Sequence, residues 1–370
     1  MEQSHPTRRD ILKTFGASVP LLSYARDSQA LAGSTHVYTK DEIERFCQKY
    51  DIPAREFHFP PQSYLGNGYA PPGGYVKDFS IVHHDGRYHL FHIDGRPEER
   101  CNETGNETTF GHASTTDFRH WIRHRMPLAV GDREWENEHV WAPYVFEWQE
   151  MFYMFYMAQG RNTGQVLTYA SSKDLEVWTK WQDGPLYQAE GRDPYVRKAD
   201  GRCYLYYTAI KGGIGAVATE DMVTFETLPH VISDPARKQA ESCSVHRLGD
   251  RYVLWYNDYI HTDSPSGDFR TVYVFSDDSL AFDSKNLRLF DFETSLPTTY
   301  SQTDWLEKRP IPISIELIKK STDIWMVCYF RWHIDRFRLF FGAIDWTKDP
   351  AKITEIVIEK QLNEIQAITG

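Results

Sequence analysis

The sequence has few cysteines, no cluster of basic residues and no long apolar run. Its five cysteines are widely spaced and include no C-x-x-C pair, so they indicate neither a disulfide framework nor a zinc site. With a formal net charge of -11 and no run of Lys or Arg, the chain would repel a nucleic acid backbone. No stretch approaches the roughly eighteen consecutive apolar residues that a membrane-spanning helix needs. We therefore expect a soluble mature protein with no nucleic acid partner and no membrane span.

The N-terminal segment has the features of an export signal. Arg8 and Arg9 precede a modestly apolar stretch, and a small-x-small sequence, A-L-A, follows at 30–32. This order resembles a twin-arginine signal; the alternative is a basic tail before a weak helix. Residues 1–32 are predicted to be a twin-arginine signal peptide, which would send the protein to the periplasm or the extracellular space.

Large aromatic residues are abundant: 11 Trp, 22 Tyr and 21 Phe make up 15% of the chain. Many of them fall in five similar segments with strand character, at 87–93, 151–157, 203–208, 251–257 and 324–330. Most of these segments follow a turn such as Asp85-Gly86 or Asp200-Gly201, and another short strand precedes each turn. The preceding strands are predicted at 79–83, 144–146, 195–197, 244–248 and 313–318.

A third strand after the aromatic one ends in a polar turn, as at 114–121, at 171–178 and, more loosely, at 218–225. Four strands per unit and five units predict an all-β fold, a five-bladed β-propeller in a single domain. An irregular β-sandwich with a second domain is the alternative. The propeller is expected over residues 71–350. It would follow an N-terminal extension at 33–70, with helical character at 40–50, and precede a C-terminal tail at 351–370.

Carboxylates recur at one place in the repeat. The strand before each aromatic one is expected to be innermost, with its first residues at the mouth of a central funnel. Asp78 and Asp193 each precede their turn by seven residues, and Glu241 precedes Gly249 by eight. Three blades would thus direct an acid into one axial pocket. The fifth blade would place Arg309-Pro310 there.

Such a set of acids suits the cleavage of a glycosidic bond. One carboxyl protonates the leaving oxygen, while another attacks the anomeric carbon or activates water. A third carboxylate nearby would raise the pKa of the acid through like-charge repulsion. Any one of these residues alone is more simply a strand cap or a solvated rim residue, but their equivalent placement favours a catalytic set.

On these residues the sequence resembles the five-bladed propeller glycoside hydrolases, families 43 and 32 and their relatives, over nearly the whole mature chain. Asp78, before IVHHDGRYHLFHI, looks like their first-blade acid, which implies a general base (family 43) or a nucleophile (family 32). Trp141-Ala142-Pro143 is similar to the W-A-P segment of family 43. Arg192-Asp193-Pro194 is similar to the R-D-P of family 32, which implies that Asp193 is a transition-state stabiliser and pKa modulator. Glu241 matches the expected order for the general acid.

The pattern of each family is incomplete here. Lys77-Asp78-Phe79-Ser80 lacks the Pro and Asn found at the first acid of family 32, and Ser242 interrupts the Glu-Cys pair of that family. The Gly-Pro typical of family 43 is also missing. The resemblance implies an exported hydrolase of the α-L-arabinofuranosidase or β-xylosidase type, acting on furanosidic or xylosidic linkages of plant- or algal-type oligo- or polysaccharides. A β-fructosidase and a non-catalytic carbohydrate-binding propeller are the alternatives.

Several further residues are candidates for binding. Trp141 could stack on a sugar ring and Arg192 could bind sugar hydroxyls; both could instead be packing or rim residues. Arg338 falls near the place where family 43 enzymes often have a substrate-binding Arg. Four histidines have strand context: His83, His84, His92 and His333. Their irregular spacing favours packed or rim side chains, so we predict no catalytic metal, no cofactor, and a carbohydrate as the partner.

Overall fold

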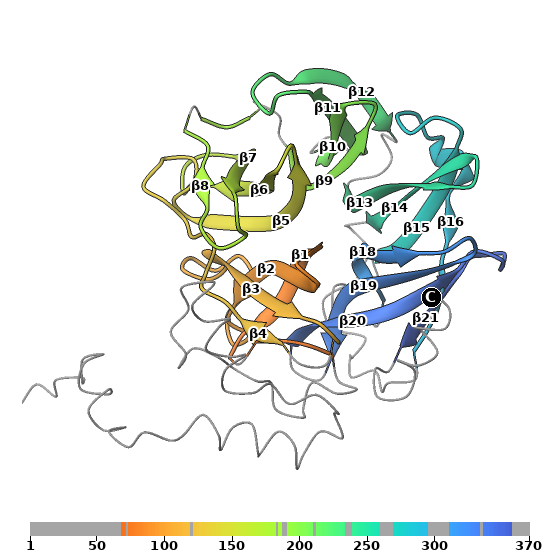
Figure 1. Cartoon of the computed structure of the whole chain (residues 1–370), viewed down its shortest axis with the longest axis horizontal. Helices are drawn as coiled ribbons and strands as arrows, with labels where there is room; N and C mark the ends of the chain where they lie inside the picture. The colour runs from red at the N-terminus through yellow and green to blue at the C-terminus, as the bar shows by residue number, and fades with distance from the viewer. Residues whose placement is uncertain are drawn as a thin grey trace, which may run out of the picture. The chain divides into compact units, whose positions relative to one another are not determined.

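The structure is a computed structural model that describes residues 68–71, 73–118, 121–182, 184–186, 191–209, 212–233, 239–259, 269–294, 311–333 and 336–356. These residues form five sheets arranged in a ring (Figure 1). Within each sheet, strands that are consecutive in sequence pair antiparallel with one another, and the first strands of neighbouring sheets are in contact around the ring. The predicted five-bladed β-propeller is confirmed.

The first blade consists of β1 (Tyr75–His84), β2 (Arg87–Gly95), β3 (Thr109–Thr115) and β4 (Ile122–Arg123). The second consists of β5 (His139–Trp148), β6 (Met151–Gln159), β7 (Gln165–Ser172) and β8 (Thr179–Lys180). The third consists of β9 (Gly191–Ala199), β10 (Arg202–Ala209), β11 (Ile214–Thr219) and β12 (Glu226–Ile232). The fourth consists of β13 (Gln239–Leu248), β14 (Arg251–Tyr259), β15 (Phe269–Ser276) and β16 (Arg288–Leu289). The fifth consists of β18 (Ile313–Lys320), β19 (Ile324–His333), β20 (Arg336–Asp345) and β21 (Lys352–Ile356), with the short β17 (Asp291–Glu293) beside β21.

The five aromatic segments are the second strands of the blades, as predicted. They are joined to the innermost strands by tight hairpins, and in the first blade both turn residues, Asp85 and Gly86, have positive φ (48° and 72°). That conformation suits a two-residue turn whose twist matches the flanking strands, and it favours Asp and Gly. The polar turns after the third strands are held by hydroxyls: the Thr115 side chain accepts hydrogen bonds from the backbone N–H groups of Asp117 and Phe118.

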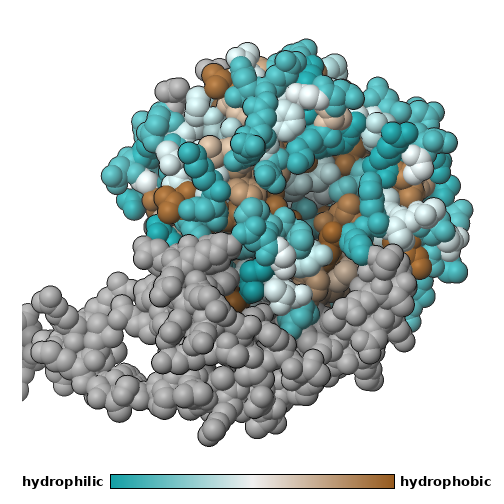
Figure 2. Space-filling model, in the orientation of Figure 1, coloured by the Kyte–Doolittle hydropathy of each residue, from teal (hydrophilic) through white to brown (hydrophobic). Residues whose placement is uncertain are grey.

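The hydrophobic core lies between neighbouring blades. Four clusters of buried side chains join residues of successive sheets, and rings such as Tyr206, Trp255 and Tyr329 are completely buried in them. Most of the aromatic content therefore packs the blades together and leaves few rings for a ligand. Figure 2 shows hydrophilic residues over most of the propeller face in view, with hydrophobic ones scattered among them.

Two backbone pairings outside the antiparallel blade strands tie the fifth blade to the rest of the ring. β17, which follows the fourth blade, pairs parallel with β21 in the fifth. Ahead of the first blade, Tyr69 exchanges two backbone hydrogen bonds of 2.8 Å with Leu339 of β20. Because β21 ends at Ile356, the propeller continues past the predicted boundary at residue 350.

Some predicted features lie outside the described residues: the signal peptide at 1–32, most of the extension at 33–70 with its helix at 40–50, and Arg309-Pro310. Within the described ranges, no helix is long and apolar enough to span a membrane. Four cysteines are described, and all four are free thiols.

Candidate active site

The innermost strands share one irregularity that positions the site. Each has a β-bulge near its start, and the bulged residue has positive φ in every blade: Asp78, Ala142, Asp193, Ser242 and Ser314, with φ between 29° and 53°. A bulge re-aims the side chains beside it and is common next to active sites. In the fifth blade the equivalent position is therefore Ser314, which corrects our expectation of Arg309-Pro310.

The residue before each bulge lines a cavity of about 430 Å³. These five residues are Lys77, Trp141, Arg192, Glu241 and Ile313, and the bulged residues Asp78 and Asp193 line the same cavity. Glu241 thus stands one residue ahead of the position that the other two acids occupy. This offset explains why it precedes its turn by eight residues and they precede theirs by seven. The three acids predicted from the sequence all reach this one cavity.

Asp193 is held from two blades. Its Oδ2 lies 3.0 Å from the hydroxyl of Thr208, which pairs with Arg192 across β9 and β10. The backbone N–H of Ser242, in the bulge of the fourth blade, donates to the same oxygen at 3.4 Å. Because Ser242 directly follows Glu241, the carboxylate of Asp193 also fixes the backbone beside Glu241.

Arg192 lies between two of the acids. Its Nε is 3.5 Å from Oδ2 of Asp193, and its Nη2 forms an ion pair with Oε1 of Glu241. The positive charge offsets the repulsion between these two carboxylates, which we had expected to raise the pKa of the acid. The Arg192 side chain is partly exposed and lines the cavity.

Two further carboxylates line the cavity, Glu107 and Glu138, and neither was predicted from the sequence; Glu107 is the more buried. It lies in the loop between β2 and β3, is 1% exposed, and accepts hydrogen bonds from Tyr75 Oη (2.6 Å) and Trp141 Nε1 (2.5 Å). Burial, and next the charge of Glu107, raise the pKa of Tyr75 far above its usual value, so Tyr75 keeps the proton that it donates. This loop lies outside the repeated strands. The one sequence feature that could have pointed to Glu107 was therefore an acidic residue beside Asn106 in a polar segment.

Trp141 lines the cavity as predicted, whereas Arg338 does not. Arg338 lies on β20, the third strand of its blade, opposite Arg331 of β19, and is absent from the cavity wall that the described residues form. Its predicted substrate contact is therefore unsupported. Its place on a third strand does not by itself explain this, because Gln165, on the third strand β7, does line the cavity.

A second cavity of about 410 Å³ adjoins the first, sharing the wall residues Gln159, Gln165 and Arg192. Its remaining wall comes from Thr163, Gly164, Thr208 and Ala209 of the second and third blades. The shared residues can all form hydrogen bonds, so the boundary between the two cavities is polar.

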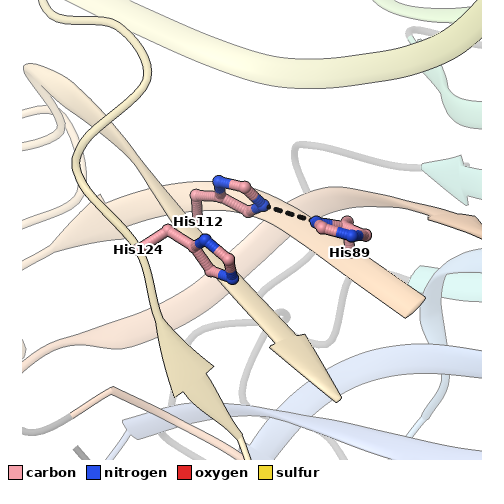
Figure 3. A group of neighbouring side chains, drawn as sticks. All are labelled: His89, His112 and His124. Carbon is pink, nitrogen blue, oxygen red and sulfur yellow. Dashed lines mark hydrogen bonds between the residues drawn. The ribbon is translucent and has the colours of Figure 1, made fainter. Parts of the chain in front are cut away.

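Three buried histidines of the first blade, none of them in the wall of either cavity, lie close together: His89, His112 and His124 (Figure 3). Their ligand atoms lie within 4.8 Å of one another, close enough to ask whether a metal ion fits. His89 Nδ1 lies 3.0 Å from His112 Nε2, and the rings of His112 and His124 stack 4.0 Å apart at 16°. The in-plane lone pairs of stacked rings run side by side and do not converge on one point.

Both nitrogens of His124 already have partners, Ser114 Oγ at 2.7 Å and Glu176 Oε1 at 2.6 Å. Burial lowers the pKa of His112 and His124 well below 6.5, and burial followed by the charge of Asp174 raises the pKa of Glu176 to about 9. The cluster is thus a buried hydrogen-bond network between the first two blades, and its geometry does not suit a metal. The four histidines considered as ligands from the sequence are not part of this cluster. His92 and His333 are buried, while His83 and His84 are at least partly exposed.

Comparison with known proteins agrees with the fold. Residues 69–215 match the family model described as the glycosyl hydrolases family 32 N-terminal domain. No curated protein sequence matches the chain. Among solved structures, the chain is similar to the family 32 β-fructofuranosidase of Bombyx mori, with a TM-score of 0.60 at 14% identity, over 86% of this chain and 69% of that one.

Two further solved structures are similar to the chain. A thermostable family 43 glycoside hydrolase has a TM-score of 0.55 at 17% identity, over 76% of this chain and 93% of that one. An exo-1,5-α-L-arabinanase from a bovine ruminal metagenomic library has a TM-score of 0.55 at 16% identity, over 76% of this chain and 97% of that one. At these identities the likeness shows the fold.

Proposed function

We propose that this chain, a member of the five-bladed propeller glycoside hydrolases, cleaves furanosidic or xylosidic linkages in plant- or algal-type oligo- and polysaccharides. The observation that supports this function is the meeting of Asp78, Asp193 and Glu241, from three different blades, in one cavity. Hydrolysis of a glycoside needs a proton donor and a second carboxylate on opposite sides of the scissile bond.

In the proposed mechanism Glu241 protonates the oxygen that leaves when the glycosidic C–O bond breaks. Asp78 either attacks the anomeric carbon or takes a proton from the water that attacks it, and Asp193 stabilises the positive charge that develops on the sugar. A carboxylate paired with a guanidinium has no proton to give, so Arg192 has to leave Glu241 first. Sugar hydroxyls in the cavity are the partners that we expect Arg192 to take.

The second cavity supports a direction for the substrate. The leaving group has to lie beside the proton donor, and Arg192, which contacts Glu241, forms part of the walls of both cavities. The polar groups of Gln159 and Gln165 continue in that direction. We therefore place the leaving group, the sugar on the reducing side of the cleaved bond, over these two residues. The sugar whose anomeric carbon reacts then lies beside Asp78 and Trp141.

A β-fructoside is the second candidate substrate. The family 32 model matches residues 69–215, which include Asp78 and the Arg192-Asp193-Pro194 sequence, and this favours fructoside chemistry. The lysine before Asp78 departs from the family 32 pattern, so we favour an arabinofuranoside or a xyloside as the substrate. A fructofuranoside and an arabinofuranoside share a five-membered ring, so the same three acids serve either one.

We also propose that the protein is exported, because residues 1–32 resemble a twin-arginine signal. Replacing Arg8 and Arg9 by Lys should keep the full-length chain inside the cell, whereas the wild-type chain should appear outside it without residues 1–32. N-terminal sequencing of the exported form checks both the route and the cleavage site. Equal export of the variant would contradict the twin-arginine route.

The test of the activity is a screen of aryl α-L-arabinofuranosides, β-xylosides and β-fructosides with the products followed by NMR. We expect turnover of one class, and the first anomer formed tells whether Asp78 attacks the sugar or activates water. Turnover of fructosides alone would select the second candidate. No turnover of any of the three classes by the folded protein would overturn the proposal.

A further inference from the structure

The Glu107 carboxylate accepts hydrogen bonds from two residues, Tyr75 and Trp141, and forms a longer ion pair with Lys77. Its Oε1 accepts from Tyr75 at 2.6 Å, its Oε2 accepts from Trp141 Nε1 at 2.5 Å, and Lys77 Nζ lies 3.9 Å away. A buried carboxylate is stable only when its oxygens are hydrogen-bonded, and here each oxygen has its own donor. The bond to Trp141 reaches from the first blade to the second.

The loop that contains Glu107 is itself held in place. The Asn106 side chain accepts from the backbone of Arg96 at 2.8 Å and donates to the carbonyl of Arg100 at 2.9 Å, which closes the loop on itself. The carbonyl of Asn106 lies 3.0 Å from His139 Nδ1, and the His139 ring stacks on Trp141 at 4.5 Å and 14°. One loop thus fixes the indole both at its edge, through Glu107, and at its face, through His139.

We propose that Glu107 is a positioning residue for the substrate: it holds the indole of Trp141 in the orientation in which the indole binds a sugar ring. This inference rests on the proposed function, because it takes Trp141 as the sugar-stacking residue. A ring that stacks on a sugar contributes only when its plane is fixed before binding, since ordering it on binding costs free energy. Glu107 therefore acts on affinity and leaves bond cleavage to Asp78 and Glu241.

The variants separate the hydrogen bonds from the charge. Glu107→Ala removes both acceptors, while Glu107→Gln keeps a carbonyl for the indole N–H and an amide that can donate to the Tyr75 hydroxyl. We expect a KM about tenfold higher in Glu107→Ala with kcat within about twofold of wild type. Glu107→Gln should restore KM to within about twofold. Thermal unfolding of each variant identifies any that fail to fold.

A double-mutant cycle distinguishes positioning from a general structural role. In a Trp141→Phe background, which has no indole N–H, Glu107→Ala should raise KM no further. The matched control is Glu138, another carboxylate of the same cavity, whose nearest described side-chain partner is Thr104 Oγ1 at 3.4 Å. The effect of Glu138→Ala should add to that of Trp141→Phe. Additive effects for Glu107→Ala would overturn the inference.

A spectroscopic measurement needs no turnover. The indole N–H signal of Trp141, assigned by its loss in Trp141→Phe, should move upfield in Glu107→Ala and stay in place in Glu138→Ala. An unmoved signal in Glu107→Ala would overturn the inference. If the wild type cleaves no glycoside, the proposed function fails, and titration of that signal with L-arabinose, D-xylose and D-fructose replaces KM. Equal affinity of wild type and Glu107→Ala would then overturn the inference separately.

Discussion

The backbone N–H of Ser242 lies 3.4 Å from Oδ2 of Asp193, so the residue after Glu241 is hydrogen-bonded to a carboxylate of the neighbouring blade. This contact links the acid that we propose as the proton donor to the acid that we propose as its modulator. It arises because the fourth blade has its bulge one residue after Glu241, whereas the third has its bulge at Asp193 itself. Two blades with the same fold thereby supply acids to one cavity from two different positions, one at the bulge and one just before it.

Replacing Glu241 by Gln should remove the proton that the leaving oxygen needs. We expect turnover of unactivated glycosides to fall by about 10²–10⁴-fold. Dinitrophenyl glycosides, whose leaving groups need no proton, should lose much less. Steady-state kinetics on the two substrate types measure the difference, and circular dichroism checks the fold. Wild-type activity on an unactivated glycoside would rule out Glu241 as the acid.

Replacing Thr208 by Val should loosen Asp193 without changing any acid. The hydroxyl lies 3.0 Å from Asp193 Oδ2 and 2.8 Å from the carbonyl of Ala240, so its loss should lower kcat about tenfold and stability by about 1–2 kcal/mol. Thr271→Val is the control, because that buried hydroxyl donates to the carbonyl of Pro312 at 2.6 Å. It should lower stability similarly and leave kcat unchanged. Equal kcat in both variants would contradict the role of Thr208.

The fifth blade depends on a fully buried ion pair. Arg331 contacts both carboxylate oxygens of Glu355, at 2.8 and 2.9 Å, so Arg331→Met leaves a buried charge without its partner. We expect a loss of about 3–5 kcal/mol in the free energy of unfolding, with a large part recovered in Arg331→Met/Glu355→Leu. The exposed pair of Arg288 and Asp349 provides the comparison: Arg288→Met should cost less than about 1 kcal/mol. Urea titration gives all three values.

Stability should depend on pH through the buried hydrogen-bond network between the first and second blades. The pKa of Glu176 rises from 4.5 to about 9 in the folded protein, so the proton it holds stabilises the fold fully below pH 4.5. That stabilisation is lost as pH rises toward 9. The lowered pKa values of His112 and His124 act oppositely, because their stabilisation is present above pH 6.5 and is lost as pH falls.

The glutamine in Glu176→Gln resembles the protonated acid. This variant should therefore not lose stability as pH rises toward 9, but it should still lose stability as pH falls below 6.5. Urea titrations of wild type and variant at pH 5, 7 and 9 measure it. A wild-type stability that rises steadily from pH 7 to 9 would show that Glu176 is ionised in the fold. The control is Asp174→Asn, which removes the nearby charge, the smaller of the two causes that raise the pKa of Glu176. It should weaken the dependence of stability on pH between 7 and 9 without abolishing it.

Much of the fold could be predicted because it repeats. Each of the five aromatic strands and its hairpin turn is a local pattern, and local patterns are visible in sequence. Glu107 and the histidine network were not found, because their partners lie far away along the chain: Glu107 is 34 residues from Trp141, and His124 is 52 from Glu176. Arg338, placed near the funnel by family resemblance, lies on β20 opposite Arg331 and is not among the described residues that line the cavity.

The sequence by itself determined the five-bladed propeller and the three acids, because strand pattern, turn residues and a repeated offset are properties of neighbouring positions. The tertiary structure alone decided the position of each acid relative to its bulge, the pairing of Arg192 with Glu241, and the loop that holds Trp141. These features depend on where the bulges fall and on contacts between blades. Such contacts form only when the ring closes and brings residues from different blades within hydrogen-bonding distance.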